Sequence, residues 1–165
     1  MELESMRKLY TYNHWANDRV LASVSGLSRE EFLREVGGSF GSMWGTLVHI
    51  FGVEWLYPQR WKGNSPRALP AADSIADFPS LQAYWNDVKA EQHSFLAELT
   101  EERLQQRVDY INLYGEKYGY PLSDQMRHLV NHSTYHRGQV TLLLRMLGKR
   151  PVSTDYLLYF DEQAG

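Results

Sequence analysis

Apolar residues recur at intervals of three and four along two long segments, residues 2–24 and 80–99, and polar residues fill the positions between them. This spacing places the apolar side chains on one face of an α-helix, because each helical residue advances by about 100°. We therefore expect one amphipathic helix in each segment. The first stripe comprises Leu3, Met6, Leu9, Tyr10, Trp15, Val20, Leu21 and Val24, and the second comprises Leu81, Tyr84, Trp85, Val88, Phe95 and Leu96.

Two further helices are predicted by the residues that begin and end them. Ser39 or Ser42 can cap a helix over about residues 42–61, in which Pro58 should bend or shorten the last turn. A fourth helix should run from Pro121, which suits a first turn, to Leu147, with Gly148 as its stop and Asp124 near its positive end.

The segments between these helices define the connections. Residues 63–77 contain two prolines and no apolar period, so they predict a long crossing loop. Residues 107–120 alternate apolar and polar positions around Gly115–Glu116, which suggests a small hairpin. The expected fold is all-α, a four-helix bundle. The long loop would let the second and third helices lie parallel, which gives an up-down-down-up order.

Length, charge and cysteine content limit the possible functions. The 165 residues, 43% of them hydrophobic, predict one domain over residues 1–165. The 17 basic and 20 acidic residues are mixed along the chain, which argues against binding to nucleic acid or to an anionic membrane. The chain has no cysteine, so any metal must be held by His, Asp or Glu. There is no signal-peptide pattern or membrane span, so we expect a cytoplasmic protein.

Three of the six histidines lie four residues apart, at His128, His132 and His136. His132 and His136 stand one helical turn apart and point the same way, as two ligands of one metal ion must. A third ligand has to come from another helix, and His49 lies in the middle of an apolar helix where a lone imidazole would be costly to bury. The set His49, His132 and His136 therefore predicts a metal site with an open position, although paired histidines at this spacing also arise by chance.

His128 is left outside this set, because successive turns drift by about 40° and two rings at most share one ion. We expect it to support the site or to hydrogen-bond a neighbour. Glu54 points about 140° away from His49, so an exposed or capping carboxylate is favoured over a ligand. Arg137 and Gln139 could orient a bound anion, but a salt bridge is favoured for them. His14 and His93 sit among polar residues and show less constraint.

Four stretches together resemble a known family. They are YNHWANDRVL in the first helix, GSMWGTLVHIFGVEWLY in the second, HLVNHSTYHRGQV in the fourth, and the closing RPVSTDYLLYF. The combination resembles the DinB family, also described as DinB/YfiT-like metalloenzymes, over nearly all 165 residues. Its most specific elements are HSTYHRGQ, residues 132–139, and the histidine at position 49.

The resemblance implies an up-down-down-up four-helix bundle, commonly a homodimer. It also implies a divalent metal ion held by the residues that match His49, His132 and His136. Together with the spacing of these histidines, the resemblance leads us to expect Zn, Ni or Fe. The family name refers to induction by DNA damage, which gives no reason to expect DNA binding, and the charge argues against it.

Three functions remain open for such a site. Some relatives resemble thiol-dependent S-transferases, in which the metal would bind the sulfur of a low-molecular-weight thiol and present a thiolate to an electrophilic small molecule. The same ligands could serve a metal-dependent hydrolase that activates water. The third function is non-enzymatic, a metal-binding or dimerisation module. The catalytic residues and the substrate are not identified by the sequence.

Overall fold

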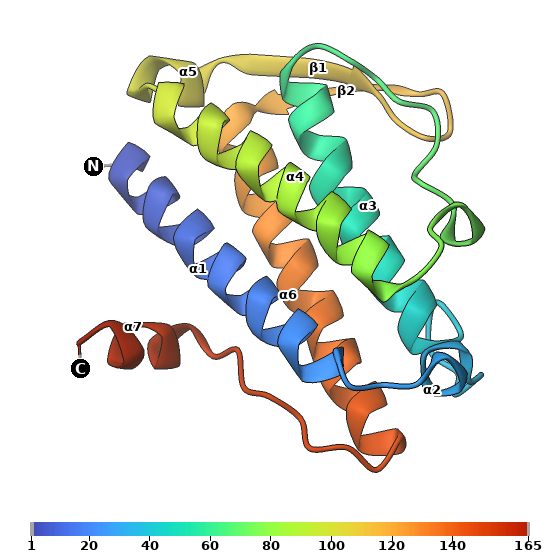
Figure 1. The fold of residues 1–165 in the computed structure, drawn as a ribbon. Coiled ribbons are helices and arrows are strands. Elements are labelled where there is room, and N and C mark those ends of the chain that lie inside the picture. The colour runs from blue at the N-terminus through green and yellow to red at the C-terminus, as the bar shows by residue number, and fades with distance from the viewer. Residues whose placement is uncertain (1, 165) are drawn as a thin grey trace.

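A computed structural model of the chain describes residues 2–164. Within them it is mainly helical, with seven α-helices, a 3-10 helix and one antiparallel pair of strands. Four helices are long and lie side by side in Figure 1: α1 (Glu2–Val24), α3 (Met43–Trp61), α4 (Phe78–Glu98) and α6 (Leu122–Met146). Both α1 and α3 contact α4 and α6. None of the described helices combines the length and the hydropathy needed to cross a membrane.

The four long helices confirm the four helices predicted from the sequence. The side chains at their N-termini explain where two of them begin. The Ser42 side chain caps α3 by accepting from the backbone of Gly45, and Asp77 caps α4 by accepting from Ser80. Pro58 does not shorten α3, which continues to Trp61. Proline has no N–H for the carbonyl four residues earlier, and the Gln92 side chain instead donates to the oxygen of Glu54 at 3.1 Å.

The predicted hairpin is confirmed as β1 (Arg107–Ile111) and β2 (Lys117–Pro121), an antiparallel pair in which Tyr110 lies opposite Tyr118. Gly115 lies in its turn with a φ of 91°, a conformation that favours glycine. The crossing loop is also present and contains one short 3-10 helix, η1 (Ala72–Ser74).

Three short helices were not predicted. They are α2 (Arg29–Leu33), α5 (Glu101–Gln105) and α7 (Tyr156–Ala164). The first carries a capping box, in which Ser28 and Glu31 exchange side-chain to backbone hydrogen bonds. Such short helices bury few side chains, so the apolar periodicity that reveals longer helices is too brief to detect.

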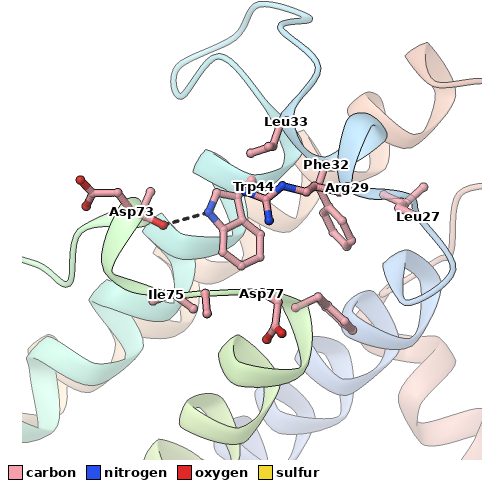
Figure 2. Close-up of a pocket in the computed structure, with 11 residues that line it drawn as sticks. Leu27, Arg29, Phe32, Leu33, Trp44, Asp73, Ile75 and Asp77 are labelled. Atoms are coloured by element: carbon pink, nitrogen blue, oxygen red, sulfur yellow. Dashed lines mark hydrogen bonds between the residues drawn. The ribbon is translucent and has the colours of Figure 1, made fainter.

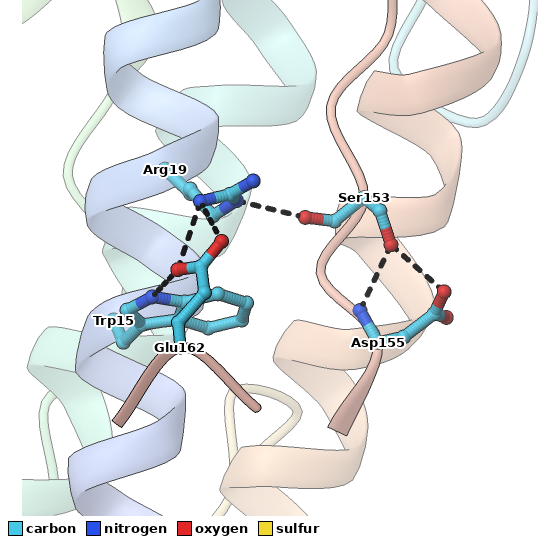
Figure 3. A network of polar contacts seen from close by, with 5 residues as sticks. All are labelled: Trp15, Arg19, Ser153, Asp155 and Glu162. Carbon is cyan, nitrogen blue, oxygen red and sulfur yellow. Dashed lines mark hydrogen bonds and ion pairs between the residues drawn. The ribbon is translucent and has the colours of Figure 1, made fainter. Parts of the chain in front are cut away.

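The C-terminal segment returns to α1 and is fixed there by polar contacts (Figure 3). Arg19 binds Glu162 on α7 with an N–O distance of 2.9 Å and donates to the backbone oxygen of Ser153 at 3.0 Å. Trp15 donates to the same Glu162 carboxylate, and Ser153 donates to Asp155. These contacts hold α7 against the outer face of α1.

A buried polar network joins the four long helices. The Glu54 side chain on α3 is only 1% exposed, and its carboxylate accepts hydrogen bonds of 2.7 to 2.8 Å from Asn13 and Asn17 on α1, Gln92 on α4 and Ser133 on α6. A carboxylate can be buried only when such donors replace its water shell. The network therefore fixes how the four helices sit against one another.

Replacing Glu54 with Ala should lower the free energy of unfolding by about 3 kcal/mol or more, because four buried donors would lose their acceptor. Urea unfolding followed by circular dichroism measures this change. Glu98→Ala, at an exposed position of α4, serves as the control and should change stability by less than about 0.5 kcal/mol. Equal losses in the two variants would contradict the role assigned to Glu54.

Candidate metal centre

His132 and His136 lie on consecutive turns of α6 and face His49 on α3, the neighbouring helix. One ring nitrogen from each of the three side chains can be chosen so that all lie within 4.8 Å of one another. The Nε2 atoms of His49 and His132 are 3.0 Å apart. The structure therefore brings together the three histidines that the sequence singled out, and the group could hold a metal ion.

Aromatic packing fixes the ring of His49. Phe40, in the loop before α3, stacks on this ring with centroids 4.0 Å apart and an interplanar angle of 21°. Gly45 permits the approach, because a Cβ there would lie 2.4 Å from the backbone oxygen of Phe40. No sequence signal pointed to Phe40, since a loop residue carries no periodicity.

Gln139 fixes the ring of His136. Its side-chain oxygen lies 2.8 Å from Nδ1 of His136, and its amide nitrogen reaches Ser39 at 3.4 Å. An acceptor at Nδ1 favours the tautomer with its proton there, which leaves Nε2 free to bind a metal. Gln139 thus supports the ring of His136. The salt bridge that we expected for Gln139 is wrong, because its side-chain amide carries no charge and hydrogen-bonds the imidazole instead.

The electrostatic setting favours neutral imidazoles. Burial, followed by the nearby His136, lowers the pKa of His49 to about 4. Burial lowers the pKa of His132 to about 3, with further contributions from His136, His49 and His128. Neutral imidazole is the form that binds metals. Nδ1 of His132 is also buried without a hydrogen-bond partner. The cluster places three imidazole rings close together without a carboxylate, and a divalent cation bound between their nitrogen atoms would explain this arrangement.

One side of the cluster remains accessible. His136 is buried, whereas His49 and His132 are half-buried. Tyr135 packs edge-on against His136 at 4.9 Å and is itself 68% exposed. A site formed by three protein ligands with a solvent-facing side leaves room for an exogenous ligand.

His128 lies outside the cluster, as expected. Its ring centroid is 6.2 Å from that of His132, and it packs against Tyr57 of α3 at 5.4 Å. Partial burial of the ring, followed by the charge of Arg60, lowers the pKa of His128, although the residue as a whole is exposed.

Three sequence-based assignments were wrong because this bundle buries polar residues on several faces. Glu54 is buried, not exposed. Arg137 is 1% exposed and forms no salt bridge within residues 2–164; it donates instead to Asn13, Asn17 and Thr134. His14 is also buried and bonds Gln92 at 2.7 Å. The signal that could have revealed this network is the pair of asparagines four residues apart on α1.

A separate cavity lies away from the histidines, between α2, the start of α3 and the start of α4 (Figure 2). Its volume is about 610 Å³, and its walls include Phe32, Trp44 and Phe78. Trp44 is held in place by a hydrogen bond of 3.1 Å to the backbone oxygen of Ala72. None of the clustered histidines lines this cavity.

Three known proteins are similar to this chain over most of its length. The chain is 28% identical to Protein DinB of Bacillus subtilis (strain 168), over 92% of this chain and 91% of that protein. It is 27% identical to the uncharacterized protein YizA of the same organism, over 92% and 94% of the two chains. The crystal structure of a DinB-like protein from Bacillus cereus ATCC 10987 shares the fold, with a TM-score of 0.71 at 17% identity over 91% of this chain and 95% of that chain.

The sequence profile of the DinB family matches residues 1–164, which is nearly the full length. The match includes the helices that carry His49, His132 and His136, and it agrees with the likeness to Protein DinB and with the fold shared with the DinB-like protein. The chain therefore belongs to the DinB family.

Proposed function

We propose that the protein is a metal-dependent enzyme in which His49, His132 and His136 bind one divalent ion, Zn, Ni or Fe, and leave a coordination position open. The observation that carries this proposal is the convergence of three imidazole nitrogen atoms within 4.8 Å on the facing helices α3 and α6. The surrounding fold is interpreted as an up-down-down-up bundle, supported by the chain directions of the four long helices in Figure 1. In this proposal the protein acts as a homodimer.

The reaction that fits the site best is thiol-dependent S-transfer. A divalent ion at this position would lower the pKa of a bound thiol, which favours the thiolate. The chain supplies no cysteine, so the sulfur has to come from a small molecule. The protein's own contribution is positional: Phe40 and Gln139 hold two of the rings, and the exposed side next to Tyr135 admits the reactants.

Hydrolysis is the second candidate, and one observation weakens it. Activation of water usually needs a general base close to the site. The histidine cluster includes no carboxylate, and buried Glu54 already accepts four hydrogen bonds in the polar network. A metal-binding module without catalysis is the third candidate, which the experiments below separate from the other two.

Metal content tests the ligand set. Protein purified without an affinity tag should contain about one divalent ion per chain, and His132→Ala should lose it, because two imidazoles are too few to hold the ion. His128→Ala is the matched control on the same helix and should keep the metal. Elemental analysis by plasma mass spectrometry measures both, and equal metal content in wild type and His132→Ala would rule out this ligand set.

The pH dependence of stability tests whether the fold holds the imidazoles of His49 and His132 in their neutral form. Because the folded-state pKa values of His49 and His132, about 4 and about 3, lie below the ordinary 6.5, protonation favours the unfolded chain. The metal-free protein should therefore be most stable above pH 6.5 and lose stability as the pH falls towards 4 and 3. His132→Gln should lose less, since one titrating ring is gone.

Urea unfolding of metal-free samples across this pH range measures the effect. His93→Gln, a change at an exposed histidine, provides the control and should follow the wild-type curve. A His132→Gln curve that runs parallel to the wild-type curve would show that this ring is not held in its neutral form.

Catalysis is tested with metal-loaded protein, an activated aryl halide as electrophile, and a panel of small thiols. Wild type should form the thioether, and His132→Ala should be slower by more than about 100-fold, beyond what the loss of a supporting residue causes. Product formation is followed by absorbance. Turnover of esters with no thioether formation would favour the hydrolase, and no turnover with a filled metal site would favour the binding module.

A further inference from the structure

Arg60 is a buried cation without an anionic partner. It lies in the last turn of α3, is 5% exposed, and forms no ion pair with any acidic group in the described part of the chain. Its Nε atom is buried and has no hydrogen-bond partner. The negative end of the helix dipole reduces the cost of this burial but supplies no hydrogen-bond acceptor for Nε. A buried donor of this kind requires an explanation, because burial of an unpaired charge is costly.

The surroundings of Arg60 explain how the guanidinium is held but leave its charge unpaired. Its Cζ atom lies 4.1 Å from the ring centroid of Tyr110 on β1 and 5.1 Å from that of Tyr57 on α3. The two rings fix the plane of the guanidinium through cation–π contacts. Nε of the other large buried arginine, Arg137, also lacks a partner, but its terminal nitrogens donate to three side-chain acceptors. Within residues 2–164, Arg60 has a side-chain hydrogen bond only with Tyr57, so its guanidinium is less completely paired than that of Arg137.

A continuous set of side chains leads from Arg60 to the histidine cluster. Tyr57 lies three residues earlier on α3, and its ring is 5.4 Å from that of His128 on α6. His128 in turn is 6.2 Å from His132, the second member of the cluster. His128 is exposed, so solvent reaches the middle of this set. The cation and the cluster thus belong to one face formed by α3, α6 and the hairpin.

Building on the function proposed above, we propose that Arg60, with the Tyr57 hydroxyl and His128, binds the carboxylate of a substrate whose reactive end reaches the three histidines. The planar guanidinium offers paired donors that match a carboxylate. Burial raises the pKa of Tyr57 to about 12, so its hydroxyl, which hydrogen-bonds with the side chains of Arg60 and Tyr110, stays protonated.

The spacing along α3 indicates the shape of this substrate. His49 and Arg60 are separated by eleven residues, or about 16 Å along the helix axis. The arginine side chain leans towards the N-terminus of its helix, which shortens the gap. The substrate is therefore an extended molecule, with its carboxylate on the order of 10 Å from the atom that reacts.

Binding of linear mercaptoalkanoates tests the proposal on the zinc-loaded protein. In a length series, the acids should bind at least about tenfold more tightly than their methyl esters at the preferred length, because the ester lacks the charge that Arg60 recognises. Arg60→Met should abolish this preference. Arg60→Lys should keep part of it, since lysine retains the positive charge but lacks the paired N–H donors of the guanidinium. Arg145→Met, the same change at an exposed position of α6, should leave it intact. Titration calorimetry measures the affinities of the acids and esters for the wild type and for the three variants.

Equal affinity for acid and ester in the wild type would overturn the proposal, as would a preference that survives in Arg60→Met. Should Arg60→Met fail to fold, the wild-type comparison and the lysine variant decide the question. The Arg60 Nε–Hε signal in NMR spectra of the metal-free protein separates this proposal from metal binding. Hexanoate should shift that signal, and methyl hexanoate should not. This result does not depend on whether the three histidines can bind a metal ion. A filled metal site with no hexanoate shift would leave the metal proposal standing and reject the carboxylate site.

Discussion

The Glu54 carboxylate is buried among the four long helices and ties them together through four hydrogen bonds. Its hydrogen bonds reach α1, α4 and α6, and a shift of any one helix would leave a buried donor or the charge itself unsatisfied. Apolar contacts alone would tolerate small sliding movements between helices. The network does not, and it therefore sets the position of α6 against α3 along their common axis.

That position is what assembles the histidine cluster. On α6 the network residues Ser133 and Arg137 directly follow His132 and His136, so one stretch of helix carries two interlocking sets. One set turns into the bundle and bonds the network, while the other turns towards His49. A displacement of one residue along the helix would separate the three rings. The polar core and the proposed metal site are thus two consequences of the same packing.

The sequence predicted the long helices, the hairpin and the three histidines, because each leaves a regular signal: apolar periodicity, alternation around Gly115, and spacing of four. The burial of Glu54 was not predicted, because its angle from His49 places it off the face that carries the histidines. However, α3 packs on both α4 and α6 and so has more than one buried face. Phe40 was missed because long-range stacking from a loop leaves no local pattern. The unpaired state of Arg60 depends on which side chains are absent around it, and only three-dimensional structure reveals that.

Anomalous diffraction from crystals of the metal-loaded protein, recorded at the absorption edge of the bound element, would locate the metal ion directly. We expect one strong peak between α3 and α6, about 2.1 Å from a ring nitrogen of each of His49, His132 and His136, with further density on the side next to Tyr135. A peak elsewhere in the molecule, or three rings in mutual contact with no peak between them, would contradict the proposed metal site.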